Sequence, residues 1–179
     1  PIAEGIADNA EIFVKLFSRL DPLAAGKRAA KKQFDLKKMI QGSFSVFTEE
    51  MKSQNVQLRV IGEDGIKFLS WQQDMSAIFT NLADNSLYWM ETKKIPDRQI
   101  VVDIVTDDGV LLHIDYHDTG PGIEPKFISS EMIFEPEFST KKSGTGLGLA
   151  IAGEAAMRNG LELKAFEAKH VAWFRLQPI

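Results

Sequence analysis

The chain lacks cysteine altogether, which excludes a disulfide framework, a cysteine nucleophile and a zinc site with cysteine ligands. Its three histidines, His113, His117 and His170, are too dispersed for the spacing of metal ligands. It also lacks an excess of positive charge: 21 Lys and Arg stand against 25 Asp and Glu, a net charge of −4, so we expect no nucleic-acid partner. No apolar run reaches the roughly 18 residues of a membrane-spanning helix, and the acidic first residues do not begin as a signal peptide does.

What is present suits one compact domain with a helical extension. The 179 residues are 44% hydrophobic and 26% charged, as in ordinary globular proteins. An amphipathic helical pattern runs over residues 2–20 and ends at Asp21-Pro22. Residues 26–33 are rich in Lys and Arg and form either an anion-binding strip or a solvated linker, of which we favour the linker. We therefore assign residues 1–34 to a helical extension and linker, and residues 35–179 to the main domain.

The main domain begins with two helical patterns. The first covers about 35–53, with Asp35 as its N-cap. The second covers about 71–91, where Ser70 and Gln73 have the spacing of a capping box.

Strand patterns surround these helices. The sequence Asp107-Asp108-Gly109 between two alternating segments predicts a β-hairpin, and Asn159-Gly160 predicts the end of a helix over about 147–158. The expected strands cover 55–62, 98–106, 110–117, 161–167 and 171–177. Helices and antiparallel strands in this order predict a two-layer α/β sandwich.

The first candidate functional segment is His-Asp-Thr-Gly-Pro-Gly-Ile-Glu at 117–124, which follows a predicted strand. Gly120 and Gly122 allow a sharp turn and let a ligand lie against the backbone without a Cβ in the way. Asp118, at the strand end, can accept a hydrogen bond from an exocyclic amine. A plain turn of the pattern D-x-G-x-G is the alternative.

The second segment is Ser-Gly-Thr-Gly-Leu-Gly-Leu-Ala-Ile at 143–151. Its glycines, Gly144, Gly146 and Gly148, run directly into a helix, where free backbone N–H groups converge and favour a phosphate. A glycine hinge before a helix is the alternative. No Lys follows the glycines as in a P-loop, and no βαβ unit precedes them as in a dinucleotide-binding fingerprint.

The third segment lies on the helix predicted over 71–91. Asn81, Asn85 and Tyr88 stand at i, i+4 and i+7 and therefore share one face of that helix. Two amides on an otherwise apolar helix are costly to bury without partners, so they indicate either a ligand or metal site or a structural hydrogen-bond network.

In this order, the three segments resemble the Bergerat-fold ATP-binding domain shared by DNA gyrase, heat-shock chaperone ATPases, mismatch-repair ATPases and sensor histidine kinases. The segment 81–86 is similar to the N box, 118–123 to the first glycine box and 144–151 to the second. Between the glycine boxes, 133–142 resembles the F box and ATP lid of the kinases, with Phe134 and Phe138 as lid-anchoring aromatics. The resemblance covers about residues 35–179 and implies a mixed, mostly antiparallel sheet with helices on one face.

The resemblance also implies a role for each matching residue. Asp118 corresponds to the aspartate that accepts from the adenine amino group, and Asn85 to the asparagine that ligates Mg²⁺, an ion that prefers oxygen ligands. Lys141 or Lys142 would neutralise the γ-phosphate. Trp89 either stacks on the adenine or belongs to the core. The residues implied to contact ATP are Asn85, Tyr88, Trp89, Asp118, Gly120, Gly122, Ile123, Thr140, Lys141, Lys142, Gly144, Thr145, Gly146, Leu147 and Gly148, and those implied to serve catalysis are Asn81, Asn85 and Lys142.

One position distinguishes the reactions of this superfamily. Hydrolytic members carry a glutamate one helical turn before the magnesium asparagine, whereas this chain has Asn81, as sensor histidine kinases do. An amide takes no proton at neutral pH, so rapid hydrolysis of ATP is disfavoured. The chain departs from the kinases at Tyr88, where they commonly carry a basic residue that reaches the phosphates. More of the phosphate charge must then be neutralised by Lys141, Lys142 and the magnesium ion.

The resemblance implies the catalytic module of a two-component sensor histidine kinase, a cytoplasmic domain that transfers the γ-phosphoryl of Mg·ATP. None of the three histidines has the sequence context of a phosphoacceptor, so the acceptor histidine is expected outside this segment. The expected partners are that histidine, a response regulator and, in the full-length protein, a second copy of the chain. The alternatives are an ATP-operated conformational switch or slow ATPase, and a degenerate module that has lost effective use of ATP.

Overall fold

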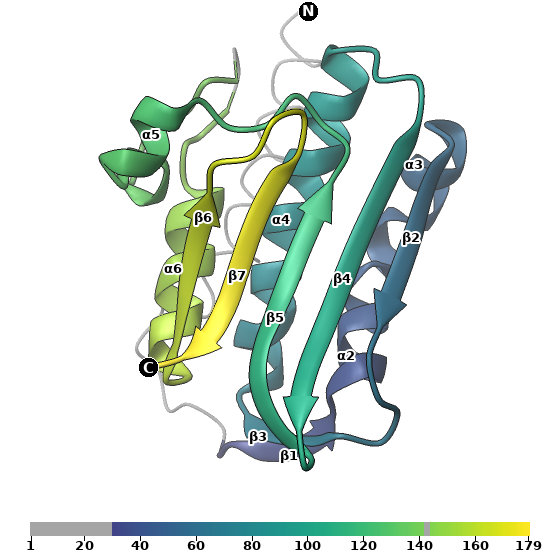
Figure 1. Ribbon diagram of the computed structural model, residues 1–179, viewed down its shortest axis with the longest axis vertical. Coiled ribbons are helices and arrows are strands. Elements are labelled where there is room, and N and C mark those ends of the chain that lie inside the picture. Colours follow the sequence, from purple (N-terminus) through teal and green to yellow (C-terminus); the bar gives the residue numbers. More distant parts are fainter. Residues whose placement is uncertain (1–29, 142–143) are drawn as a thin grey trace, which may run out of the picture. The chain divides into compact units, whose positions relative to one another are not determined.

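A five-stranded sheet forms one layer of the computed structural model, which describes residues 30–141 and 144–179 (Figure 1). All elements below belong to the compact unit 31–179. The strand order is β2-β4-β5-β7-β6; β2 and β4 are parallel and the other neighbours antiparallel. The strands are β2 (Val56–Ile61), β4 (Arg98–Asp107), β5 (Val110–Asp118), β6 (Leu161–Phe166) and β7 (Ala172–Pro178). The mixed, mostly antiparallel sheet expected from the resemblance is confirmed.

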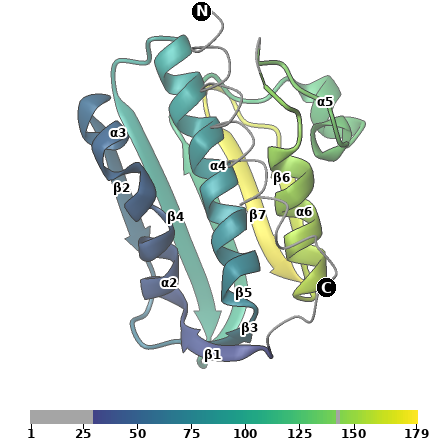
Figure 2. The same ribbon diagram turned by 180° about the vertical axis from the view of Figure 1, so that it is seen from behind.

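Helices cover one face of this sheet, so the fold is the predicted two-layer α/β sandwich (Figure 2). The helices of this layer are α2 (Leu36–Ser43), α3 (Thr48–Ser53), α4 (Gln72–Thr92) and α6 (Gly148–Arg158). The short α5 (Pro125–Ser129) and the 3-10 turn η2 (Met132–Phe134) lie in the connection between β5 and α6. No helix among residues 30–141 and 144–179 is both long enough and apolar enough to cross a membrane.

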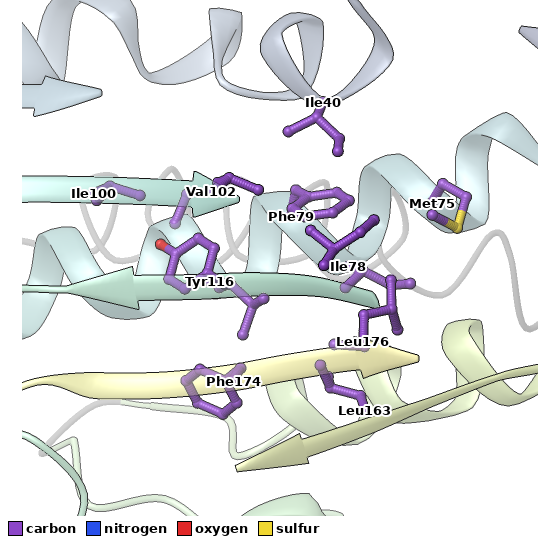
Figure 3. Close-up of a cluster of buried hydrophobic side chains, with 14 of the residues drawn as sticks. Ile40, Met75, Ile78, Phe79, Ile100, Val102, Tyr116, Leu163, Phe174 and Leu176 are labelled. Carbon is purple, nitrogen blue, oxygen red and sulfur yellow. The ribbon is translucent and has the colours of Figure 1, made fainter. Parts of the chain in front are cut away.

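The core lies between the two layers (Figure 3). Alternate residues of the strands point toward the helices, and the apolar stripe of α4 meets them. The buried side chains that meet there include Ile40, Met75, Ile78, Phe79, Ile100, Val102, Tyr116, Leu163, Phe174 and Leu176. This packing fixes α4 and the end of β5, which carry two of the three segments singled out in the sequence.

The helix predicted over 35–53 is interrupted. Asp35 is its N-cap, as predicted, and its carboxylate accepts from the Lys38 N–H at 3.0 Å. After α2 the chain forms a 3-10 turn, η1 (Ser45–Phe47), before α3 begins. The hydroxyls of Ser43 and Ser45 donate to nearby backbone carbonyls, which offers the backbone an alternative to the helix.

The linker expected over 26–33 is wrong for its last two residues. Lys32 and Gln33 lie in strand β1 (Lys32–Asp35), which pairs antiparallel with β3 (Lys67–Ser70). Phe34 of β1 packs edge-on against Phe68 of β3, with ring centroids 6.2 Å apart. This partner is more than thirty positions away, so the local sequence does not reveal the pairing. The helix expected over 2–20 and residues 26–29 of the linker lie outside the described residues.

The capping box predicted at the start of α4 is also wrong. The N-cap is Trp71, and the Ser70 hydroxyl donates instead to Asn159 Oδ1 at the end of α6. Asn159 belongs to a buried polar network with Asp74 and Arg158. The Arg158 guanidinium donates to both carboxylate oxygens of Asp74 at 3.0 Å, and the Asn159 amide donates to Asp74 at 3.4 Å. The network joins the first turn of α4 to the last turn of α6.

Candidate functional site

Asn81 lies at the centre of the site, on the face of α4 that meets α6. Its side chain is 2% exposed, and its Nδ2 donates to the Ala77 carbonyl at 2.8 Å. Its Oδ1 is buried and accepts no hydrogen bond from residues 30–141 or 144–179. A Cβ built on Gly148, the first residue of α6, would lie 3.1 Å from that oxygen. A buried oxygen that accepts no hydrogen bond destabilises the fold, so Asn81 Oδ1 calls for a donor from outside these residues, such as an ordered water beside a bound ligand.

The glycine segment before α6 includes a position that requires glycine. Gly146 has φ +70°, and a Cβ there would lie 2.6 Å from the Glu137 carbonyl oxygen, so only glycine fits without a shift. No side chain of the described residues caps the N-terminus of α6. Its first N–H groups have no partner within the helix, and their dipoles favour negative charge.

Asp118 is the last residue of β5 and directly precedes the first glycine segment. It is buried, with 5% of its surface exposed. One carboxylate oxygen accepts from the Gly120 N–H at 2.8 Å and the Ala172 N–H at 3.4 Å. The other accepts from the Ser86 hydroxyl. A Cβ on Gly120 would lie 2.7 Å from the carboxylate, so the glycine at this position is required by close approach.

Ser86 and Tyr116 orient this carboxylate, and sequence reasoning missed both. The Ser86 hydroxyl donates its one proton to Asp118, so the Tyr116 hydroxyl, 2.7 Å from Ser86 Oγ, donates to Ser86. Burial, and to a lesser degree the Asp118 charge, raise the pKa of Tyr116 well above 10.0, so Tyr116 stays a donor. The sequence feature that could have revealed Tyr116 is its inward-facing position in the alternating pattern of β5. For Ser86 the only such feature is its place next to Asn85.

The pKa of Asp118 gives a test of this environment. Burial raises it above 3.8, although hydrogen bonds from Ser86 and Gly120 act in the opposite direction. The folded chain then holds a proton that the unfolded chain has lost, so stability should decline as the pH rises from 3.8 through the raised pKa. Urea unfolding from pH 4 to 7 should show this decline relative to Asp118→Asn. A constant difference between the two proteins would contradict the assignment.

The connection between β5 and α6 packs through aromatic side chains. Phe127 of α5 contacts Phe138 edge-on, with ring centroids 4.9 Å apart. Phe134 and Phe138 are half-buried against the core, and a Cβ on Gly153 of α6 would lie 3.7 Å from the Phe134 ring. The two phenylalanines expected to anchor the lid therefore lie against the domain.

Lys141, at the end of this connection, reaches back to α4. Its Nζ lies 3.1 Å from Asp84 Oδ2 and 4.6 Å from the centroid of the Tyr88 ring. Tyr88 in turn contacts Trp89 edge-on, with centroids 5.0 Å apart. Lys142 lies outside the described residues. The structure thus brings Lys141 to Asp84 and Tyr88 of α4, the helix that also carries Asn81 and Asn85.

The other residues expected to contact a nucleotide surround this centre. Asn85 and Leu147 are half-buried, Thr140 and Thr145 are exposed, and Ile123 packs against the core. Gly122 has φ +81°, and a Cβ there would lie 3.1 Å from the Ala168 carbonyl oxygen. An open hollow of about 640 Å³ adjoins Gly120, extends to the end of α4 at Lys93 and is lined on another side by His170.

Two of the three histidines contact neighbouring strand residues. His113 Nε2 lies 3.5 Å from Asp115, and the His117 ring stacks on Trp173 with centroids 5.3 Å apart. Within residues 30–141 and 144–179, no group of three or more His, Asp or Glu side chains is placed to hold a metal ion.

Among the described residues, the site combines a buried carboxylate acceptor, a buried amide oxygen without a hydrogen-bond partner and a glycine segment before a helix that no side chain caps. This is the combination that the resemblance implies for a purine nucleotide with a polyphosphate. Its place in a two-layer sandwich agrees with the expected Bergerat-type domain. The family model described as "Histidine kinase-, DNA gyrase B-, and HSP90-like ATPase" matches residues 72–177, and the chain belongs to that family. The resemblance predicted from the sequence is therefore confirmed, and membership implies ATP as the nucleotide.

Several curated relatives are named as kinases. Sensor histidine kinase ZraS of Escherichia coli strain K12 is 26% identical over 160 residues, which cover 89% of this chain and 33% of the relative. Sporulation kinase A of Bacillus subtilis is 33% identical over 127 residues, or 70% of this chain and 20% of the relative. The chain therefore spans about a third or less of the length of these relatives.

Solved structures confirm the fold. The catalytic domain of histidine kinase ThkA superposes with a TM-score of 0.72 at 20% identity, covering 84% of this chain and 96% of that domain. Histidine kinase AdeS of Acinetobacter baumannii gives a TM-score of 0.75 at 14% identity, covering 98% of this chain and 82% of that one.

Proposed function

We propose that this chain carries the catalytic module of a sensor-type histidine kinase, which binds Mg·ATP and transfers the γ-phosphoryl group to a histidine outside residues 1–179. The observation that carries the proposal is Asn81. Its amide oxygen is buried without a partner among the described residues and faces the start of α6, so it can orient a water or a donor there. An amide cannot remove a proton from water, so this position supports transfer to an already nucleophilic imidazole better than hydrolysis.

We assign the recognition of ATP to three elements. Asp118 accepts from the adenine amino group, which is possible because its carboxylate is held by Ser86 and Gly120. The glycine segment 144–148 and the first turn of α6 surround the phosphates. Asn85, half-buried on α4, supplies an oxygen ligand for Mg²⁺, which neutralises phosphate charge when bound.

The proposed partners are supported by the relatives, which are named as a sensor histidine kinase and a sporulation kinase. We propose a response regulator as the final phosphate acceptor and a homodimer as the working form of the full-length protein. Because ATP is the substrate, the module is assigned to the cytoplasm.

The test is a filter assay in which the full-length protein is incubated with Mg²⁺ and γ-labelled ATP. Acid-labile label on the protein supports the kinase. Phosphate release without label would indicate a slow ATPase or conformational switch instead, and neither product would indicate a degenerate module.

Asn85→Asp tests the metal assignment. The change keeps the size of the side chain but adds a negative charge beside the phosphates, so the affinity for Mg·ATP should fall at least about tenfold, which corresponds to ~1.4 kcal/mol. Calorimetric titration with Mg²⁺ and with EDTA measures the effect. Asn55→Asp, in the exposed turn before β2, is the matched control and should bind Mg·ATP normally. Unchanged Mg²⁺ dependence in Asn85→Asp would refute the assignment.

A further inference from the structure

Lys141 is held on α4 by two contacts of different kind. Asp84 and Tyr88 stand one helical turn apart, on either side of Asn85 in the sequence. The Lys141 ammonium lies between them, 3.1 Å from Asp84 Oδ2 and 4.6 Å from the Tyr88 ring centroid. The Lys141 side chain is only 16% exposed, so most of this long side chain is withdrawn from water.

The two contacts fix a group that is otherwise mobile. A lysine side chain has many rotamers, and an ammonium on a free side chain spreads its charge over a wide volume. The face of an aromatic ring attracts a cation by its quadrupole, and an ion pair adds a second restraint. Together they set the Lys141 charge at a defined place on the helix that carries Asn81 and Asn85.

We propose that Tyr88 is a positioning residue: its ring face, together with Asp84, holds the Lys141 ammonium beside Asn85, where the phosphates of ATP bind. The inference rests on the proposed function of this site. Tyr88 acts through Lys141 and contributes its ring rather than its hydroxyl. Tyr88 is uncharged, but by holding Lys141 it places a positive charge at the phosphate site.

This role separates two substitutions of the same residue. Tyr88→Phe keeps the ring face, so it should bind Mg·ATP within about twofold of the wild type. Tyr88→Leu removes the ring, so affinity should fall about three- to thirty-fold, as for a contact of this class. Lys141→Met should weaken binding at least as much, and adding Tyr88→Leu to it should have little further effect, because both changes remove the same contact.

The control is another cation above a ring in the same connection. Lys126 Nζ lies 4.6 Å from the Phe127 ring centroid, the same distance as for Lys141 and Tyr88. Lys126→Met removes that contact, and we expect its affinity for Mg·ATP to equal that of the wild type.

A nucleotide-free measurement tests the contact itself. The ε-methylene protons of Lys141, observed by NMR in lysine-labelled protein, should be shifted upfield by the ring current in the wild type and in Tyr88→Phe but not in Tyr88→Leu. The inference is overturned if the wild type shows no upfield shift. It is also overturned if the wild type binds Mg·ATP and Tyr88→Leu binds it equally tightly. Wild-type protein that shows the shift but binds no ATP would instead overturn the proposed function, and this inference with it.

Discussion

Replacing Asp74 with alanine should lower the free energy of unfolding by about 3–5 kcal/mol, because it removes the close, buried partner of the Arg158 guanidinium. Glu154, whose carboxylate lies 3.6 Å from Arg158 and is 59% exposed, replaces little of that interaction. The Asp74 side chain is 6% exposed and that of Arg158 14%, and two hydrogen bonds of 3.0 Å join them. Asn159 would lose the same acceptor. Urea unfolding followed by circular dichroism measures the loss.

Two further variants show whether the loss of stability comes from the buried ion pair. Asp64→Ala also breaks an ion pair of a carboxylate, with Lys37 at 2.9 Å, but the Asp64 side chain is 90% exposed, so its stability should hardly change. The double variant Asp74→Ala/Arg158→Met removes both charges and should recover much of the loss. A loss in Asp74→Ala no larger than that in Asp64→Ala would show that the buried network does not hold α4 to α6.

The second large effect concerns the glycine segment. Gly146→Ala should weaken the binding of Mg·ATP about ten- to a hundredfold, because strain of ~1–3 kcal/mol must be relieved by moving the N–H groups that face the phosphates. A Cβ at Gly146 meets the Glu137 carbonyl oxygen at 2.6 Å, and φ is +70°, so the segment must move away from the connection that precedes it. Calorimetric titration gives the affinity.

Gly160→Ala is the control for backbone strain alone. Gly160 has φ +72° and follows the far end of α6, but a Cβ there would meet no atom of the described residues within 4 Å. Gly160→Ala should therefore lose about 1–2 kcal/mol of stability from strain alone. Gly146→Ala should lose at least as much, because its Cβ also meets the Glu137 backbone, and only Gly146→Ala should bind Mg·ATP more weakly. Equal affinity in the two variants would contradict the role of Gly146.

Local patterns predicted most of the elements correctly. The alternating segments 98–106 and 110–117 around Asp107-Asp108-Gly109 form the β4–β5 hairpin, and Asn159-Gly160 ends α6 with Gly160 at φ +72°. These predictions succeeded because period, turn residues and caps act over a few neighbours. The capping box at Ser70 failed because a distant partner, Asn159, competed for the same hydroxyl.

The residues of the site also divide into those that local patterns predicted and those that only long-range contacts revealed. The sequence pointed to Asp118 and to the shared face of Asn81 and Asn85, since strand ends and helical spacing follow from local geometry. It did not reveal that Ser86 and Tyr116 orient Asp118, because that contact joins α4 to β5 across the core.

The sequence by itself determined the five strands of the main sheet, the two helices that carry the site, the glycine-rich turns and the family to which the chain belongs. Only the tertiary structure decided which charges meet: Lys141 contacts Asp84 across 57 positions, and Arg158 contacts Asp74 across 84. The physical reason is that secondary structure is set by short-range periodicity, whereas ion pairs and orphaned buried oxygens depend on which surfaces the hydrophobic core brings together.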